Sequence, residues 1–197
     1  MFSGIEHQFV ISSIVGDGCL IKPYDGANHR LAWNMGNREH SLFKVDNGAF
    51  LNLKMQEKEN PGFGSEWYCI KSSCSPVLSM YAKKYGDSKG LIQESGLPGE
   101  LDAVGWAWYY GDDGHYNKSG KNCFLHTEGK SPEYVREIME ALRKFIGSSG
   151  VNVHQYVGGS KKRKLECLRV NVDETIEFHK RIEKHMADGM EYKIRRD

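Results

Sequence analysis

Two apolar runs that each close on an Asp-Gly pair constrain the fold of this chain more than any other feature. They cover residues 9–18 and 101–114 and close on Asp17-Gly18 and Asp113-Gly114. An apolar run followed by glycine is typical of a helix that stops there, because glycine readily adopts the positive φ common just past a helix end. We therefore predict two helices with Asp17 and Asp113 in their last turns and both glycines in the left-handed region.

The position of these two carboxylates predicts a bound cation. A negative charge at a helix C-terminus opposes the helix dipole and costs roughly 0.3–1 kcal/mol. Small residues in both runs allow the backbones to approach closely, namely Ser12, Ser13, Gly105 and Ala107. If the helices pair there, both carboxylates reach the same end of the pair. Carboxylates with no neighbouring His or Cys favour a hard, oxygen-binding ion such as Mg²⁺.

A family resemblance is carried by Ile14-Val15-Gly16-Asp17-Gly18 and Tyr109-Tyr110-Gly111-Asp112-Asp113-Gly114. These segments resemble the two signature motifs of the LAGLIDADG homing endonucleases, and two motifs in one chain resemble the single-chain, pseudo-symmetric branch. The alternative is a pair of buried apolar helices with fortuitous Asp-Gly ends. The copies differ, since Gly16 stands where the second has Asp112. In the second helix we expect Trp106, Tyr109 and Tyr110 in the core, and Gly105 and Ala107 nearer the partner helix.

The order of predicted elements repeats along the chain, as in an internal duplication. The expected helices cover about 5–16, 37–47, 75–85, 101–113, 131–145 and 173–186, and the expected strands cover 19–22, 29–35, 67–71, 115–118, 123–127, 151–157 and 164–172. Residues 54–64 are polar and contain Gly and Pro, which predicts a loop. In the helix over 37–47, the predicted apolar stripe is Leu42, Phe43 and Val45.

The resemblance covers nearly the whole chain and implies its fold. It implies an α+β chain with a duplicated αββαββα-type LAGLIDADG fold, in which two antiparallel sheets form a DNA-binding saddle around a central helix pair. The chain then divides into an N-terminal half at 1–86, a linker at 87–97 and a C-terminal half at 98–197.

Composition sets weaker limits on function. The net charge of +1 is nearly neutral, so bulk charge does not indicate a nucleic-acid partner. Five cysteines form no CxxC pair, which favours reduced intracellular thiols over a zinc site. Because no run approaches membrane-spanning length and residues 1–8 do not read as a signal peptide, we expect an intracellular protein of the cytoplasm, nucleoid or an organelle, not secreted and without a membrane partner.

Polar and basic residues alternate along the predicted strands. In the saddle that the resemblance implies, such side chains would contact bases and phosphates of double-stranded DNA. The alternative is a solvated outer sheet face, which alternates in the same way. The predicted DNA-binding residues are Arg30, Asn34, Lys71, Asn152, His154, Lys162, Arg163, Lys164 and Arg169.

Two lysines match family positions. Lys193, in Met190-Glu191-Tyr192-Lys193-Ile194, resembles the C-terminal active-site lysine of the single-chain members. Lys89 resembles its counterpart in the first half by its spacing before the second motif, with Lys83 and Lys84 as alternatives. A lysine beside the scissile phosphate would stabilise developing charge or orient a water. The alternative is that these are ordinary surface lysines.

The resemblance implies that a monomer cleaves both strands of a long, asymmetric DNA site, and that its gene is intron-encoded or free-standing. Asp17 and Asp113 would bind Mg²⁺ with help from the backbone carbonyls of Gly16 and Asp112, and Mn²⁺ is expected to substitute. The metals would activate water and stabilise the attacking and leaving oxygens. One alternative is an intron maturase, which would bind intron RNA, or a DNA-binding module that does not cut. A third is a small-molecule enzyme with a dicarboxylate site in a deep apolar pocket.

Overall fold

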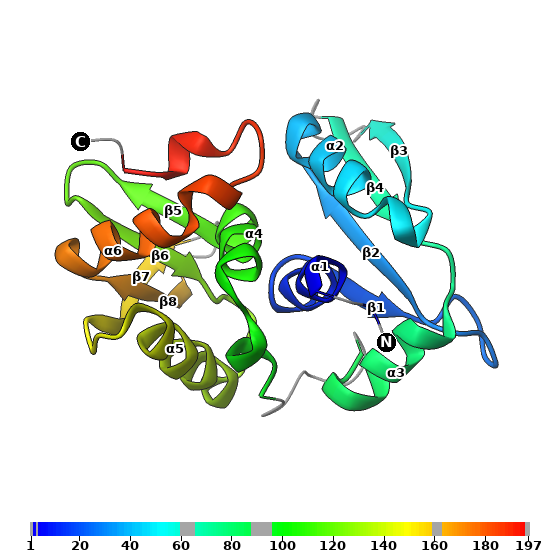
Figure 1. The fold of residues 1–197 in the computed structure, drawn as a ribbon, viewed down its shortest axis with the longest axis horizontal. Coiled ribbons are helices and arrows are strands. Elements are labelled where there is room, and N and C mark those ends of the chain that lie inside the picture. The colour runs from blue at the N-terminus through cyan, green and yellow to red at the C-terminus, as the bar shows by residue number, and fades with distance from the viewer. Residues whose placement is uncertain (1, 3, 60–65, 88–95, 159–162, 196–197) are drawn as a thin grey trace.

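The computed structural model describes residues 2, 4–59, 66–87, 96–158 and 163–195. Within these ranges the chain forms six α-helices and two four-stranded antiparallel sheets. Two α/β halves lie on either side of a central helix pair, α1 (Gly4–Val15) and α4 (Ala103–Asp113) (Figure 1). The predicted α+β fold with a duplicated element order is therefore confirmed. In the described part of the chain, every helix is too short or too polar to cross a membrane.

The first half contains one sheet and two helices besides α1. Its strands are β1 (Cys19–Ile21), β2 (Arg30–Met35), β3 (Lys54–Glu59) and β4 (Glu66–Lys71), in the order β1-β2-β4-β3. The helices are α2 (Arg38–Asn47) and α3 (Pro76–Tyr85). The register pairs Trp33 with Ile70, and both are buried in the core. Because side chains alternate along a strand, the even-numbered positions of β2 lie on the opposite face.

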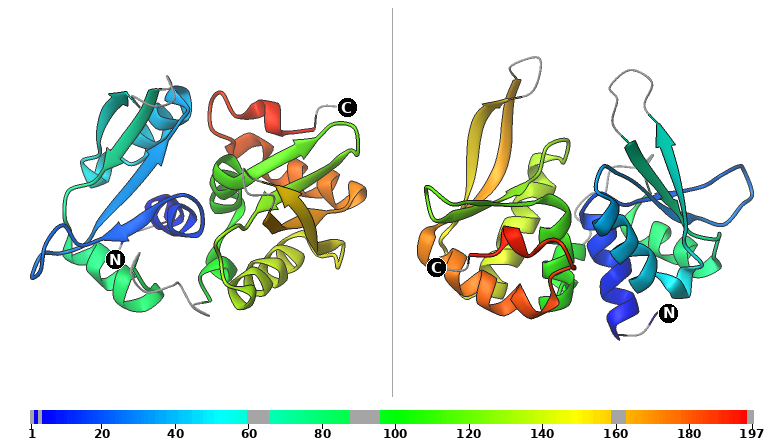
Figure 2. Two further views of the ribbon diagram at one scale, coloured as in Figure 1. Left: turned by 180° about the vertical axis from the view of Figure 1, so that it is seen from behind. Right: turned by 90° about the horizontal axis from the view of Figure 1, so that it is seen from above.

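The second half repeats this arrangement. Its strands are β5 (Gly114–Asn117), β6 (Asn122–His126), β7 (Val151–Gly158) and β8 (Arg163–Val170), in the order β5-β6-β8-β7. The helices are α5 (Pro132–Ile146) and α6 (Val172–Ile182). Ser131 caps α5 by accepting a hydrogen bond from the Tyr134 amide, as its place before the Pro-initiated helix predicts. The β3–β4 and β7–β8 hairpins extend to the same side of the molecule, away from the start of α1 (Figure 2).

The prediction of a loop over 54–64 is wrong for its first part. Residues Lys54–Glu59 form β3, an edge strand paired only with β4 in the described sheet. An edge strand needs few apolar residues and often carries lysines. Among the described side chains of this strand, only Met55 packs against the core, so the alternation that marks a strand is almost absent from its sequence. Residues 60–64 of that prediction belong to a segment outside the described residues.

The aromatic residues of α4 lie in the core, as expected. Trp106, Tyr109 and Tyr110 are fully buried. Gly105 lies against α1, since a Cβ on it would come within 2.2 Å of the Gln8 side chain. These three rings point into the core and Gly105 faces the partner helix, whereas the Trp108 ring packs edge-on against Phe9 of α1 with ring centres 5.5 Å apart.

Gly18 and Gly114 do not adopt the predicted left-handed conformation. Gly114 has φ −86°, and Gly18 is not among the described glycines with positive φ. The lack of room for a side chain explains why both positions are glycine. A Cβ on Gly18 would lie 2.6 Å from the Ser13 carbonyl oxygen, and one on Gly114 would lie 2.1 Å from the Tyr110 ring. Glycine is needed here because the chain turns closely past its own helix.

We expect Gly114→Ala to destabilise the protein by about 1–3 kcal/mol, the usual cost of forcing an extra carbon into a packed site. The cost is steric, because alanine adopts the backbone angles of Gly114 readily. Gly36→Ala is the matched control, since nothing lies within 4 Å of a Cβ at that position. Equilibrium unfolding in urea would measure both variants. Equal stabilities for the two would contradict the steric explanation.

Candidate active site

The two motif helices run side by side in the same direction. At their starts, the Gln8 side chain donates to the Glu100 carbonyl (2.9 Å) and accepts from the Asp102 amide (3.1 Å). At their ends, a Cβ on Gly16 would lie 2.7 Å from Asp112 Oδ2. The N-terminal parts of the two helices are therefore adjacent, and so are their C-terminal ends. Asp17, in the turn after α1, and Asp113, the last residue of α4, consequently occupy the same end of the pair.

Asp113 is the more buried of the two aspartates. Its side chain is 14% exposed, and its Oδ2 is buried without a hydrogen-bond partner. Burial raises the pKa of Asp113 to about 8; Lys130 opposes this shift, and the charges of Asp17 and Asp112 add to it. Such an orphaned carboxylate oxygen is costly unless a cation offsets it.

Asp17 is more accessible, and its backbone turns away from α1 into β1. Partial burial raises the pKa of Asp17, the nearby Asp112 carboxylate raises it further, and Lys44 is the first of the lysines that lower it. The two aspartates thus share one electrostatic environment. Each would hold its charge more readily with a divalent cation beside it.

The residues at the helix ends fit Mg²⁺. Two carboxylates converge there, and one oxygen of Asp113 accepts no hydrogen bond and has only the Lys130 ammonium 3.9 Å away. Within the described residues, no three His, Cys, Asp or Glu side chains form a complete metal cage. Proteins commonly hold Mg²⁺ with one or two carboxylates plus waters and substrate phosphates. Asp17 and Asp113 would supply the side-chain oxygens, and the carbonyls of Gly16 and Asp112 remain predicted ligands.

The raised pKa of Asp113 predicts that Mg²⁺ binding to the free protein strengthens as pH rises toward about 8. Below that pH the carboxyl holds a proton that the metal must displace. In the metal-free protein, the free energy of unfolding changes with pH in the opposite direction to Mg²⁺ binding. The folded state binds the proton more tightly than the unfolded state, so stability falls as pH rises from near 4 to about 8. Melting curves with and without Mg²⁺ would measure both trends.

Asp113→Asn is the control for this prediction, because it removes the titrating group. The pH dependence of the Mg²⁺-induced rise in Tm should become shallower in that variant. A rise in Tm that is the same at every pH in the wild-type chain would contradict the prediction.

Lys193 reaches the end of α4. Its Nζ donates to the Gly111 carbonyl (2.8 Å), and its own carbonyl accepts from the Tyr110 hydroxyl (2.9 Å). It lies in the 3₁₀ turn η4 (Glu191–Lys193), so this C-terminal segment is fixed to α4 at two points. Burial lowers the pKa of Lys193, while Asp112, Asp113 and Asp17 raise it. All three acidic side chains therefore lie within electrostatic range of this ammonium.

Lys130 reaches the end of α1 from the other half of the molecule. It precedes α5, and its Nζ donates to the Val15 carbonyl (2.8 Å). The same ammonium lies 3.9 Å from Asp113 Oδ2 and 6.0 Å from the centre of the Tyr109 ring. Its side chain is 17% exposed. Lys130 was not among the residues predicted from sequence.

Asp112 forms a buried ion pair with Lys44 of α2. Lys44 Nζ lies 2.9 Å from Asp112 Oδ2, and the two side chains are 1% and 0% exposed. His40 Nε2 lies 3.2 Å from the other carboxylate oxygen. Burial, Lys44 and Lys193 lower the pKa of His40 to about 3, so the imidazole is neutral. Lys44 comes from the first half and Asp112 from the second, so this pair joins the halves.

The predicted apolar stripe of α2 is confirmed only in part, because Phe43 and Val45 pack against the core but are not its buried residues. The buried residues of α2 are His40, Ser41 and Lys44, whereas Leu42, Phe43 and Val45 are only partly buried. The helix turns its polar side inward because Asp112 lies beneath it and needs a cation. Lys44 Nζ also lies 5.9 Å from the ring centres of Phe9 and Trp33, which favour a cation over their faces.

Comparison with solved structures relates this geometry to known proteins. The homing endonuclease I-WcaI bound to its DNA recognition sequence superposes with a TM-score of 0.79, covering 99% of this chain and 88% of that chain at 16% sequence identity. The chain has the LAGLIDADG homing-endonuclease fold. I-DmoI in complex with DNA and Ca is also similar, with a TM-score of 0.55 at 14% identity over 90% of this chain and 88% of that one. The N-terminal LAGLIDADG domain of WhiA gives 0.54 at 10% identity over 92% and 85%.

Sequence comparison gives fewer matches than comparison of structures. No protein-family model matches the chain. A curated sequence, Protein RecA of Mycobacterium gastri, is 26% identical over 208 residues, which cover 98% of this chain and 48% of that protein. The chain thus spans about half the length of the curated protein it matches.

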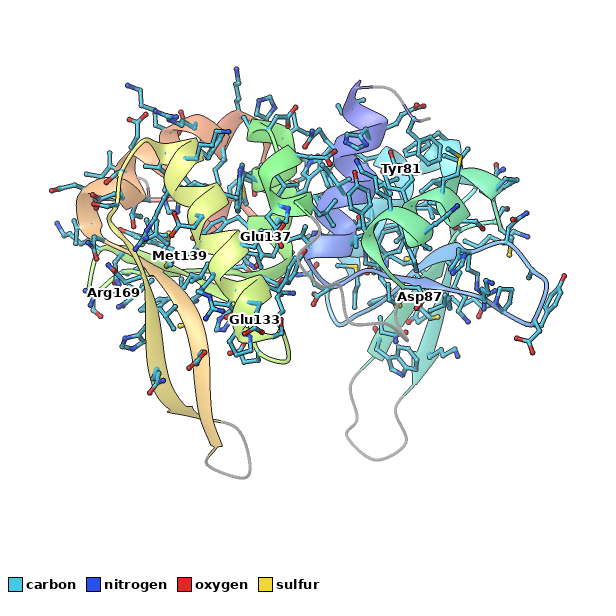
Figure 3. All side chains as sticks on the ribbon, turned by 90° about the horizontal axis from the view of Figure 1, so that it is seen from below. Tyr81, Asp87, Glu133, Glu137, Met139 and Arg169 are labelled. Carbon is cyan, nitrogen blue, oxygen red and sulfur yellow. The ribbon has the colours of Figure 1, made fainter. Side chains whose placement is uncertain are left out.

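Six predicted DNA-binding residues lie on the sheet faces opposite the core of the LAGLIDADG halves. In the first sheet, Arg30, Asn34 and Lys71 share this face, because Ala32 pairs with Lys71 and Asn34 with Cys69. In the second, Asn152 pairs with Arg169, and His154 with Cys167. Figure 3 labels Arg169 near the base of the β7–β8 hairpin.

The structure describes less of the three remaining predicted DNA-binding residues. The backbones of Arg163 and Lys164 lie in β8, and their side chains are outside the described part. Lys162 lies outside the described residues altogether. The strand that sequence reasoning missed adds Lys54, Gln56 and Lys58 to the outer face of the first sheet, because Lys54 pairs with Lys71 and Gln56 with Cys69.

The predicted first-half lysine, Lys89, also lies outside the described residues. Of its two alternatives, Lys84 bonds to Glu100 (2.9 Å) with its side chain 60% exposed, near the starts of the motif helices rather than their ends. Lys83 is exposed on the same helix, α3. Among described lysines, the ones that contact the helix ends are Lys44, Lys130 and Lys193.

Proposed function

We propose that this chain is a site-specific DNA endonuclease that cuts both strands of its target in an Mg²⁺-dependent reaction. The observation that carries the proposal is the meeting of Asp17 and Asp113 at one end of the α1–α4 pair, where one buried carboxylate oxygen has no hydrogen-bond partner. The fold shared with DNA-bound homing endonucleases supports double-stranded DNA as the substrate.

Each part of the chain has a role in this proposal. The outer sheet faces bind the duplex through Arg30, Asn34, Lys71, Asn152, His154 and Arg169. Asp17 and Asp113 hold Mg²⁺ at the helix ends, with the carbonyls of Gly16 and Asp112 completing the protein ligands. Bound Mg²⁺ supplies an activated water and offsets charge on the scissile phosphates.

Lys193 acts beside the metal ligands. Its ammonium is anchored to the Gly111 carbonyl and lies near all three aspartates. In this position it would stabilise negative charge that develops on a phosphate oxygen, or orient a water. The Tyr110 hydroxyl holds the Lys193 backbone, so the lysine is positioned before DNA binds.

The test starts from an unknown target. A library of randomised duplexes is selected for binding in Ca²⁺, and the selected duplexes are then incubated with the full chain and Mg²⁺. We expect double-strand cleavage at a defined position, loss of cleavage with EDTA and activity with Mn²⁺. Binding without cleavage in either metal would refute the endonuclease and favour a DNA-binding module on the same fold. Binding only to structured RNA would favour a maturase.

A further inference from the structure

The geometry points to Lys130 as a positioning residue of the aspartate centre, the counterpart at the α1 end of Lys193 at the α4 end. This inference rests on the proposed endonuclease function and deepens it. The two lysines bind equivalent backbone carbonyls. Val15 lies two residues before Asp17, and Gly111 lies two residues before Asp113. Both carbonyls accept a lysine Nζ at 2.8 Å.

A lysine therefore donates to the equivalent carbonyl at the end of each motif helix, although the two lysines come from different segments of the chain. Lys193 belongs to the C-terminal segment, and Lys130 belongs to the loop between β6 and α5. Both lysines lie in the second half of the chain, so the bond from Lys130 to Val15 crosses to the first half. The matching pattern at the two pseudo-equivalent carbonyls indicates a common role at the two helix ends.

The surroundings of Lys130 fix its ammonium in place. The Val15 carbonyl anchors it, Asp113 Oδ2 lies 3.9 Å away, and the Tyr109 ring closes another side at 6.0 Å. A freely moving surface lysine would have none of these constraints. The side chain nevertheless keeps a partial exposure of 17%, close to the 14% of Asp113.

Three effects follow from this position. The bond to Val15 holds the turn that carries Asp17. The positive charge beside Asp113 limits how far that carboxylate attracts other cations when no DNA is present. With DNA bound, the same charge lies next to the metal ligands and favours the phosphate. Lys130 thus connects both aspartates, one through the backbone and one through charge.

The test compares Lys130→Met with Lys130→Arg on the selected duplex. In Lys130→Met we expect single-turnover cleavage to fall by roughly 100-fold, with DNA affinity in Ca²⁺ and Tm close to wild type. Lys130→Arg should recover part of the rate, because arginine retains the positive charge although its planar guanidinium differs in shape from an ammonium. Lys193→Met is the comparator and should show a loss of similar size. Lys180→Met, at an exposed position of α6, is the control and should cleave normally.

Two results would overturn the inference. One is a Lys130→Met variant that cuts at the wild-type rate. The other is a Lys130→Arg variant as defective as Lys130→Met with a comparable loss of Tm, because that would assign the residue a structural role only.

A readout without cleavage separates this inference from the proposed function. Mn²⁺ binding to the free protein is measured by calorimetry above the pKa of Asp113. Removing the positive charge 3.9 Å from Asp113 should tighten Mn²⁺ binding by roughly threefold or more in Lys130→Met, and Lys130→Arg should match the wild type. If the wild-type chain cuts no duplex, the endonuclease proposal fails. An unchanged Mn²⁺ affinity in Lys130→Met would then overturn the Lys130 inference as well.

Discussion

Replacing either Asp17 or Asp113 with asparagine is expected to reduce double-strand cleavage by on the order of 10³-fold. Asparagine keeps the size of the side chain but removes the charge that binds the metal. Either single substitution should be sufficient to cause this loss of cleavage, because the two carboxylates share one electrostatic environment. Single-turnover cleavage of the selected duplex would measure the effect, with the two strands resolved separately.

DNA binding provides the control within the same variants. Both should bind the duplex in Ca²⁺ at least as tightly as the wild type, because each loses a negative charge close to the phosphates. Asp46→Asn, at an exposed position of α2, should leave both binding and cleavage unchanged. Wild-type cleavage by Asp17→Asn or by Asp113→Asn would refute the role assigned to that residue.

The second large effect concerns stability. Lys44→Met is expected to destabilise the fold by about 3–5 kcal/mol, because it leaves the Asp112 carboxylate buried without its cation. Asp112→Ala should be comparably costly, since it leaves the Lys44 ammonium unpaired. The double variant should cost much less than the sum of the two, because neither charge then remains buried. Equilibrium unfolding in urea, applied to all four proteins of the cycle, would measure this coupling.

An exposed ion pair of equal length supplies the comparison. Lys84 and Glu100 are also 2.9 Å apart, but their side chains are 60% and 35% exposed. Lys84→Met should therefore cost below about 1 kcal/mol. The account of the buried pair would be wrong if Lys44→Met cost no more than Lys84→Met, or if the two single effects simply added.

Much of this fold could be predicted from sequence because its signals are local. The Pro-initiated helices α3 and α5 begin where Ser75-Pro76 and Ser131-Pro132 predict, and the hairpin β1–β2 follows the first motif as expected. The small residues of the motif helices predicted that the two backbones could approach closely, and Gly105 does lie against α1. These features depend on a few neighbouring residues, and the tertiary packing agrees with that local preference.

The parts that were missed depend on partners distant in sequence. Lys44 resembles a solvent-facing lysine until Asp112, 68 residues away, is brought beneath it. Lys130 resembles a turn lysine until the Val15 carbonyl, 115 residues away, accepts its hydrogen bond. The glycines after each motif were predicted for their φ, whereas they are required by the closeness of the Tyr110 ring and the Ser13 carbonyl. A single sequence does not encode these contacts in a local pattern.

One signal for Asp112 was available in the sequence. It differs from Gly16 at the same position of the other motif, and a third acid beside two metal ligands needs compensation. The side chain of Asp112 is bound to Lys44, so its carbonyl is the part left to serve as the predicted metal ligand.

The location of Mn²⁺ in crystals of the protein bound to its selected duplex tests the central claim most directly. Anomalous scattering would mark each ion independently of any activity. We expect ions bonded to the Asp17 and Asp113 carboxylates at the common end of α1 and α4, and none on the Asp112–Lys44 pair. Ions bound elsewhere on the chain, with both carboxylates free of metal, would contradict the account.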